Sequence, residues 1–260
     1  MKVFEERAVS DVLAFVLTFG IIITSVGLVY GIGFASLSDF QEGEQKTNAV
    51  RAFDALSTTF DDIQAGKGPG RSGSLDLSGG TLQVTNDTDI GVTVEDGGGT
   101  VLWSSTQFNN SSGSLQYSFE GTDVAYENGA VFRKDGDSPV MVSEPSFSCQ
   151  RPASGPNRAV VSLVVLRSDE NAIGGDTNVE IISRKTASTS TLQYIYPDRT
   201  GGGRGSVDVS VTVDDSAYET AWGRYFDDSD NDWTRSGNTA TCTGADTAIV
   251  RVTVVSVEFQ

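Results

Sequence analysis

A stretch of 27 residues without any charged side chain, residues 12–38, constrains this chain more than any other feature. It lies between Asp11 and Asp39 and consists mainly of Leu, Ile, Val, Phe and Gly. As an α-helix that rises about 1.5 Å per residue, it would be about 40 Å long, enough to cross a hydrocarbon core of about 30 Å. The apolar part of a secretory signal peptide is shorter, about 7–15 residues. The stretch therefore predicts a retained membrane helix.

The cations that flank this stretch predict its orientation. Lys2 and Arg7 precede it, and the nearest cations after it are Lys46 and Arg51. Because Lys and Arg close to a span remain on the cytoplasmic side, we expect the N-terminus inside and the chain after about residue 38 outside. An external location suits a chain with two cysteines and with Asn-x-Ser/Thr sequons, although single sequons also arise by chance. The candidate glycosylation sites are Asn86, Asn109 and Asn110.

Small residues recur along one face of the predicted membrane helix, at Gly20, Thr24, Gly27 and Gly31. Spacings of four, three and four residues place them on one side of a helix, where another backbone can approach closely. Two interpretations are open. Glycine is frequent in membrane helices in general, or this helix is built to pack against copies of itself.

The segment from Asp39 to Ile63 predicts an amphipathic continuation of the helix, a stalk. Its apolar side chains recur at helical spacing and form one stripe, opposed by charged residues. The stripe comprises Phe40, Val50, Phe53, Leu56, Phe60 and Ile63. The sequence Gly-Lys-Gly-Pro-Gly at residues 66–70 predicts the end of the helix.

The remainder of the chain predicts strands, and the fold class is therefore α+β: a long membrane and stalk helix, then a β-rich, sandwich-like external domain with one short helix. Ser216 to Phe226 has apolar residues at helical spacing, with Asp214 and Asp215 expected to cap it. The expected strands are residues 74–84, 91–95, 100–104, 114–119, 159–166, 179–184, 191–196, 207–213 and 248–259.

Composition excludes several classes of function. The net charge of -17 opposes nucleic-acid binding, which needs a basic surface. The chain has no histidine, so the Ser-His and Cys-His catalytic arrangements and most zinc sites are absent. We expect no enzymatic activity and no cofactor. Among the 18 cations, 5 are Lys, an acidic and Lys-poor composition that suits a protein of salt-rich surroundings; an ordinary acidic extracellular protein is the alternative.

Three groups of residues are candidate sites. Cys149 and Cys242 would close a loop of about 90 residues as a disulfide, the alternative being two buried thiols. Asp228, Asp230 and Asp232 begin like a calcium loop but lack its Gly and Glu, so they form either a nonstandard calcium site or a solvated acidic turn. Aromatic residues near the short helix form either an exposed ligand platform or, more in keeping with their spacing, part of the core. They are Trp222, Tyr225 and Trp233.

The order of these parts resembles that of archaeal type IV pilin-like proteins with a class III signal sequence, above all those of haloarchaea. Residues 7–13, Arg-Ala-Val-Ser-Asp-Val-Leu, are similar to the start of that family, in which a short charged leader precedes a long apolar helix. Asp11 departs from the family's usual proline, which is typical of a divergent or minor member. Residues 48–56 are also similar to a group of haloarchaeal pilin-like envelope proteins. The likeness covers about residues 1–65 well, and the β-rich remainder only in outline.

The resemblance implies that a prepilin peptidase cuts after Ala8, with Arg7 before it and Val9 as the first mature residue. The chain would then divide into a leader at 1–8, a membrane helix and stalk at 9–65 and an extracellular domain at 66–260. Its expected partners are the peptidase, membrane lipid, and copies of itself or other pilin-like subunits. The expected function is a structural or adhesive subunit that assembles into, or initiates, an extracellular filament. The alternative is an anchored ectodomain that never polymerises and binds an S-layer or other envelope component.

Asp11 has two interpretations in this setting. A carboxylate buried in a filament would need a partner, such as the amino terminus of a neighbouring subunit, whereas one at the lipid interface would not. The apolar stripe separates the two functions in a similar way. A filament subunit can bury it against neighbouring stalks, and a monomer should bury it against its own sheet.

Overall fold

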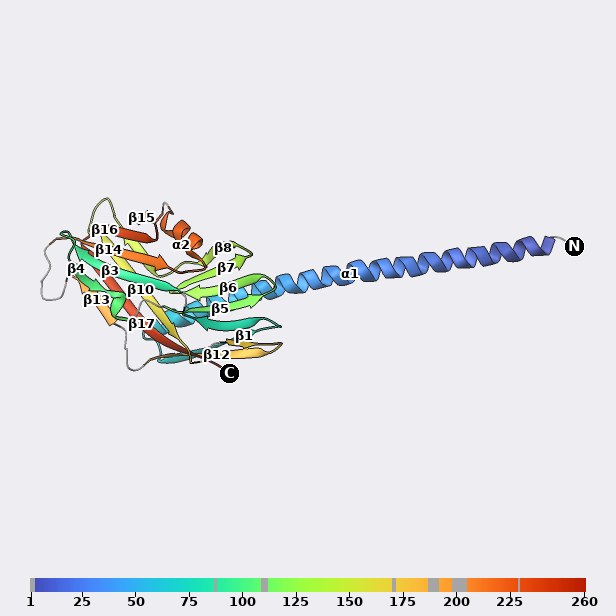
Figure 1. The fold of residues 1–260 in the computed structure, drawn as a ribbon, viewed down its shortest axis with the longest axis horizontal. Coiled ribbons are helices and arrows are strands. Elements are labelled where there is room, and N and C mark those ends of the chain that lie inside the picture. Colours follow the sequence, from blue (N-terminus) through green and yellow to red (C-terminus); the bar gives the residue numbers. More distant parts are fainter. Residues whose placement is uncertain are drawn as a thin grey trace. The chain divides into compact units, whose positions relative to one another are not determined.

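The computed structural model describes residues 3–86, 88–108, 112–169, 172–186, 192–197, 205–228 and 230–260, and of residues 3–10 it describes the backbone alone. The predicted α+β fold class is confirmed: one long N-terminal helix precedes a strand-rich part that contains one short α-helix among these residues (Figure 1). By its internal contacts the chain divides into two compact units, residues 1–45 and 46–260. The second unit is called the strand domain below.

Helix α1 runs from Val3 to Gln64 and belongs to both units. It ends where the glycine-rich sequence predicts, because Gly66 adopts a φ of 77°, a left-handed conformation that glycine reaches without strain. The N–H of Gly66 donates to the carbonyl oxygen of Ile63 and that of Lys67 to Asp62, which closes the last turn.

The described strands form three sheets. The first contains β1 (Gly70–Asp76), β12 (Asn178–Lys185), β17 (Thr247–Phe259), β10 (Arg158–Arg167) and β9 (Phe147–Gln150) in this order, with β13 (Leu192–Tyr196) also on β17. The second has the order β11 (Ala172–Gly174), β2 (Thr81–Thr85), β5 (Ser114–Phe119), β6 (Thr122–Glu127), β7 (Ala130–Asp135) and β8 (Ser138–Ser143). The third has the order β15 (Thr234–Ser236), β16 (Thr239–Ala245), β14 (Val207–Asp214), β3 (Asp89–Asp96) and β4 (Val101–Ser104), and η1 (Ser105–Phe108) follows β4.

The pairing between β10 and β17 is parallel, from Arg158 opposite Thr247 to Arg167 opposite Ser256. The other strand pairs are antiparallel, and β5 to β8 follow one another as hairpins. The turn between β6 and β7 is Asn128-Gly129, with φ values of 48° and 96°. Both residues are left-handed, as the tight turn of a two-residue hairpin requires.

Two local expectations were wrong. Residues 74–84 form two strands of different sheets, because the chain turns at Ser78 and Gly79, which have φ values of 42° and 92°. Helix α2 (Glu219–Phe226) begins later than expected, and its N-cap is Tyr218 without a side-chain hydrogen bond. Asp214 instead ends β14 and Asp215 has a φ of 58°, so neither aspartate caps the helix.

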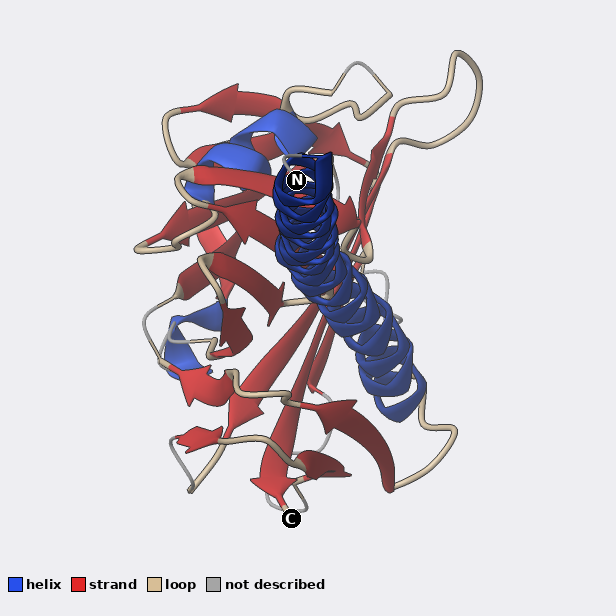
Figure 2. Ribbon diagram, turned by 90° about the vertical axis from the view of Figure 1, so that its right-hand side faces the viewer, coloured by secondary structure: helices blue, strands red, loops and turns tan. Residues whose placement is uncertain are grey.

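Two apolar clusters fill the strand domain on either side of the first sheet. One lies between the first and third sheets, takes in α2 and also includes Ala125, Ala130 and Phe132 of the second sheet. Figure 2 shows the short helices in blue beside the strands. The other lies between the first and second sheets and includes the last part of α1, from Ala49 to Ile63. Alternating residues of β10 supply both clusters: Leu163 and Val165 face the first, while Val164 and Leu166 face the second.

Candidate functional site

The surface of α1 before residue 41 is the most unusual surface of the molecule. The described side chains from Asp11 to Phe40 are all exposed, although most of them are apolar. The chain therefore has one helix long and apolar enough to cross a membrane, and nothing in the part that the structure describes covers it. Apolar surface of this extent is unfavourable in water, so the helix needs lipid or other protein around it.

The small residues predicted for helix packing lie on this exposed surface. A Cβ atom added at Gly20, Gly27 or Gly31 would meet no atom within 4 Å, so each position is open to a neighbour. The polar side chains nearby are satisfied within the helix, because the hydroxyl of Thr18 donates to Ala14 O at 2.8 Å and that of Ser25 to Ile21 O at 2.7 Å. Such bonds let a hydroxyl-bearing helix lie in an apolar environment.

The apolar stripe of the stalk is divided between two environments. Phe40, at its start, is 64% exposed, whereas Phe53 and Phe60 are fully buried in the strand domain. The ring of Phe60 lies 4.6 Å, centroid to centroid, from the ring of Tyr126 on β6. The end of the stripe is thus buried against the chain's own sheets and closed to other stalks, and its exposed residue, Phe40, lies before residue 41.

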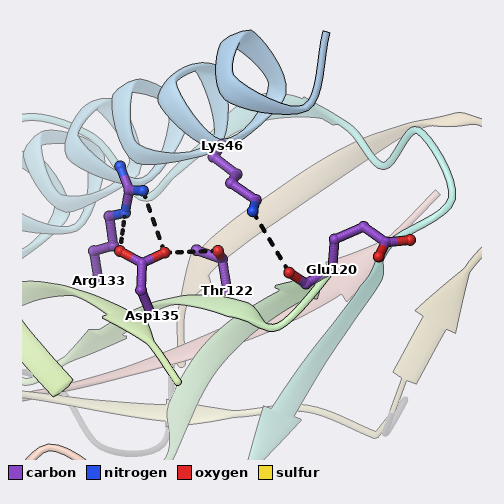
Figure 3. A network of polar contacts seen from close by, with 5 residues as sticks. All are labelled: Lys46, Glu120, Thr122, Arg133 and Asp135. Carbon is purple, nitrogen blue, oxygen red and sulfur yellow. Dashed lines mark hydrogen bonds and ion pairs between the residues drawn. The ribbon is translucent and has the colours of Figure 1, made fainter. Parts of the chain in front are cut away.

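A polar network lies where α1 meets the hairpins of the second sheet (Figure 3). The Nζ of Lys46 lies 3.5 Å from the carbonyl oxygen of Glu120 in the turn between β5 and β6. Asp135 receives hydrogen bonds from Arg133 Nε at 2.8 Å and from the hydroxyl of Thr122 at 2.7 Å. Arg133 and, to a smaller extent, Thr122 and Lys46 hold the pKa of the Asp135 carboxyl below its usual value. Lys46 thus ties the first residues of the strand domain to the turn between β5 and β6, while the bonds to Asp135 join β6 and β7.

Further contacts fix residues 46–64 of α1 in the strand domain. The hydroxyl of Ser143 on β8 donates to Asp54 Oδ1 at 2.5 Å. Near the end of the helix, Gln64 Nε2 donates to the carbonyl oxygen of Leu163 at 3.0 Å, and Arg71 on β1 lies 3.0 Å from Asp62. These contacts supplement the apolar packing, which supplies most of the stabilisation.

A buried carboxylate near α2 was not among the predicted site residues. Glu127, at the end of β6, is 1% exposed and accepts hydrogen bonds from Thr88 Oγ1 at 2.8 Å, Ser216 Oγ at 2.8 Å and Trp222 Nε1 at 3.0 Å. Burial raises the pKa of the Glu127 carboxyl, and the three donors oppose that rise. The cluster joins the second sheet to α2 and to the start of β3. The sequence around Glu127 carries no local signal for it, since its donors lie 39 to 95 residues away.

The structure places the other predicted sites as follows. Cys149 on β9 and Cys242 on β16 form a disulfide, with Cα atoms 5.6 Å apart, which joins the first sheet to the third. Asn86 follows β2 and is exposed, whereas Asn109 and Asn110 lie outside the described residues. The backbone of the expected cleavage site is helical, and the side chains of residues 7–9 lie outside the description.

The acidic run does not gather into a metal site within the described residues. The N–H of Asp230 donates to Asp228 Oδ1 at 3.0 Å, and the N–H of Arg151 donates to Asp232 Oδ2 at 2.7 Å. Trp222, Tyr225 and Trp233 are buried, which confirms that they belong to the core. The ring of Phe226 lies between the two tryptophans, 5.9 Å from Trp222 and 5.7 Å from Trp233.

The fold defines a class of protein with one exposed apolar helix followed by a strand-rich domain. Within that class the chain belongs to a family of unknown function, DUF7289, which matches residues 7–260. No curated protein and no solved structure matches the chain.

Proposed function

We propose that this chain is a pilin-like subunit that is held in a membrane by residues 12–38 and assembles into, or initiates, an extracellular filament through the same helix. The observation that carries the proposal is the exposed apolar surface of α1 before residue 41. A lipid bilayer and a bundle of neighbouring helices are the two environments that accommodate such a surface, and a filament subunit uses first one and then the other. The resemblance of residues 7–13 to the start of pilin-like proteins supports the same proposal.

The division of the stalk stripe is compatible with assembly. The strand domain holds α1 from Ala49 onward, so a subunit can present the earlier part of the helix to neighbours without unfolding its own core. Removal of the charged leader would leave an N-terminus that enters an apolar helix bundle more readily. The exposed Asp11 would then be the first carboxylate in the helix, close to the new amino terminus of the cut chain.

One observation favours a second function, an anchored ectodomain that binds an envelope component and does not polymerise. Phe53, Leu56, Phe60 and Ile63 are buried against the chain's own sheets, as a monomer requires. In this case the exposed part of α1 would remain in lipid.

The N-terminal peptide of the protein extracted from its native membrane, identified by mass spectrometry, separates the two functions. A chain that starts at Val9 shows processing by a prepilin peptidase and supports assembly. An intact Met1 or Lys2 start, together with the absence of filaments in electron micrographs, removes the filament mechanism and leaves the anchored ectodomain.

A pair of substitutions with a matched control tests the packing face itself. Gly27→Leu and Gly31→Leu fill the face on which a second helix would pack, and both should abolish filaments while the chain still inserts in the membrane. Gly33 lies on the opposite side of the helix, at about 100° of rotation per residue, so Gly33→Leu adds the same side chain away from that face. Gly33→Leu should therefore leave filaments intact, and filaments that survive both Gly27→Leu and Gly31→Leu would show that this face does not pack.

A further inference from the structure

Exposed apolar side chains are scarce in the strand domain and are confined to two strands. Among the side chains described after residue 64, the exposed large hydrophobic ones are Val101 (54%) and Leu102 (41%) on β4, and Val140 (53%) and Val142 (45%) on β8. Both strands are at the edge of their sheets, β4 in the third sheet and β8 in the second. Exposed apolar edge strands invite association, and natural proteins commonly protect them with charges.

Neither strand carries a charge, although two other features limit pairing: β8 contains Pro139, and each strand has a register shift against its neighbour. β4 has the sequence Val-Leu-Trp-Ser and β8 has Ser-Pro-Val-Met-Val-Ser, without a charged residue in either. The chain as a whole has a net charge of -17, so two copies repel each other over most of their surface. Uncharged apolar edges are where that repulsion is weakest and where burial of apolar surface is most favourable.

The strands beside the two edges differ in charge. Glu95 on β3 is opposite Val101, and Asp96 follows it. On the other edge, Arg133 of β7 is opposite Val140 and Lys134 is opposite Pro139. Arg224 of α2 also lies there, since it donates to the carbonyl oxygen of Pro139 at 2.9 Å.

Acidic residues are present near β8 as well. Asp135 pairs with Arg133 at 2.8 Å, and Asp137 lies in the turn between β7 and β8. Glu144 directly follows β8, and Asp54 of α1 accepts a hydrogen bond from Ser143. The surroundings of β8 are therefore mixed in charge. The strand beside β4 is acidic opposite Val101, because it carries Glu95 and Asp96 there. A contact of β8 with β4 brings cations to the acidic side, whereas a contact of β4 with another β4 would bring Glu95 and Asp96 of two copies together.

Both edges are held in place before any contact forms. The ring of Trp103 on β4 stacks on that of Tyr194 on β13, with centroids 6.0 Å apart. β8 is held by Ser143, which donates to Asp54 of α1, and by Arg224. Little ordering would accompany docking, which lowers its entropic cost.

We propose that β8 of one copy packs against β4 of the next, with Val140 and Val142 of the first against Val101 and Leu102 of the second. This inference rests on the proposed function, because it names a partner, a second copy, for the strand domain of an assembling subunit. β4 and β8 lie toward opposite ends of the strand domain (Figure 1). A contact between two different surfaces is head to tail, so each copy leaves one edge open for another and a chain of copies can grow.

Cysteine crosslinking tests the contact in the full-length chain, in membranes and in filaments. The native cysteines are already joined to each other, so introduced ones report the contact alone. A chain with both Leu102→Cys and Val140→Cys should form a ladder of crosslinked copies under mild oxidation. A mixture of the two single variants should yield dimers, and neither single variant alone should crosslink. Ser72, exposed on the edge strand β1, provides the control: Ser72→Cys combined with Val140→Cys should form no ladder.

The outcomes separate this inference from the proposed function. If the wild-type chain forms filaments but the double variant forms no ladder, the contact is refuted and the filament function stands. Crosslinked dimers of a single variant would also refute it, because they indicate that like edges meet. A ladder of crosslinked copies without filaments would support the contact between β8 and β4 and refute the proposed filament function. Unfolding of the variants, followed by tryptophan fluorescence, should match that of the wild type because the substituted side chains are exposed.

Discussion

Phe60→Ala tests whether the stalk is part of the core of the strand domain. The Phe60 side chain is fully buried between the first and second sheets and contacts the ring of Tyr126. Replacing a buried phenylalanine by alanine removes its transfer free energy and leaves a cavity, a combined loss of about 3–5 kcal/mol in the free energy of unfolding. In a domain of this size, each kcal/mol lowers the melting temperature by about 2–4 °C. We therefore expect a fall of about 6–20 °C.

Phe40→Ala provides a matched control. It is the same substitution in the same helix and in the same apolar stripe, but Phe40 is 64% exposed. Its effect on the free energy of unfolding should remain within about 0.5 kcal/mol, as for other surface positions. All three tryptophans, at residues 103, 222 and 233, lie in the strand domain, so their fluorescence follows its unfolding in urea or on heating in detergent. Equal effects of the two substitutions would refute the assignment of residues 49–63 to the core.

Three further predictions concern the strand domain. Replacing Cys149 and Cys242 by serine should lower the free energy of unfolding by about 2–5 kcal/mol, measured by urea unfolding, because the bridge closes a long loop. Burial raises the pKa of Glu127 in the folded state, so the wild type should lose stability as the pH rises through this folded-state pKa. Glu127→Gln has no such carboxyl, so its free energy of unfolding, measured by urea unfolding, should increase relative to that of the wild type as the pH rises. Gly80→Ala should destabilise by about 1–3 kcal/mol, since its Cβ would lie 2.4 Å from a tyrosine ring, whereas Gly97→Ala should be nearly neutral because its Cβ would meet no atom within 4 Å.

Each of these predictions has a result that contradicts it. An unchanged urea midpoint in the serine variant would mean that the bridge does not constrain the unfolded chain. A constant difference between Glu127→Gln and the wild type from pH 4 to pH 8 would mean that Glu127 keeps its ordinary pKa of about 4.3. Equal midpoints for Gly80→Ala and Gly97→Ala would mean that the tyrosine ring yields to the added methyl group.

Much of the architecture could be predicted because it depends on local patterns. The 27 uncharged residues favour a helix whatever follows them. In an apolar environment backbone N–H and C=O groups must be hydrogen-bonded within the chain, and a helix achieves this locally. The glycine-rich sequence after Gln64 ends that helix by the properties of its own residues. Most expected strands were also found, because β-branched residues in short runs between turns favour them. The dipeptide Asn128-Gly129 is a comparable local signal, because both residues readily adopt the left-handed conformation of a hairpin turn.

The tertiary structure alone decided which of these surfaces are covered. Phe40 and Phe60 belong to the same helical stripe and are equivalent in the sequence, yet one is exposed and the other buried, because burial depends on where distant sheets lie. The Glu127 cluster likewise draws together side chains from three separate parts of the chain. The exposed valines of β8 resemble the buried valines of other strands, and only the order of strands in the sheet makes β8 an edge. A sequence thus determines where its apolar side chains are, whereas long-range packing determines which of them remain available to a partner.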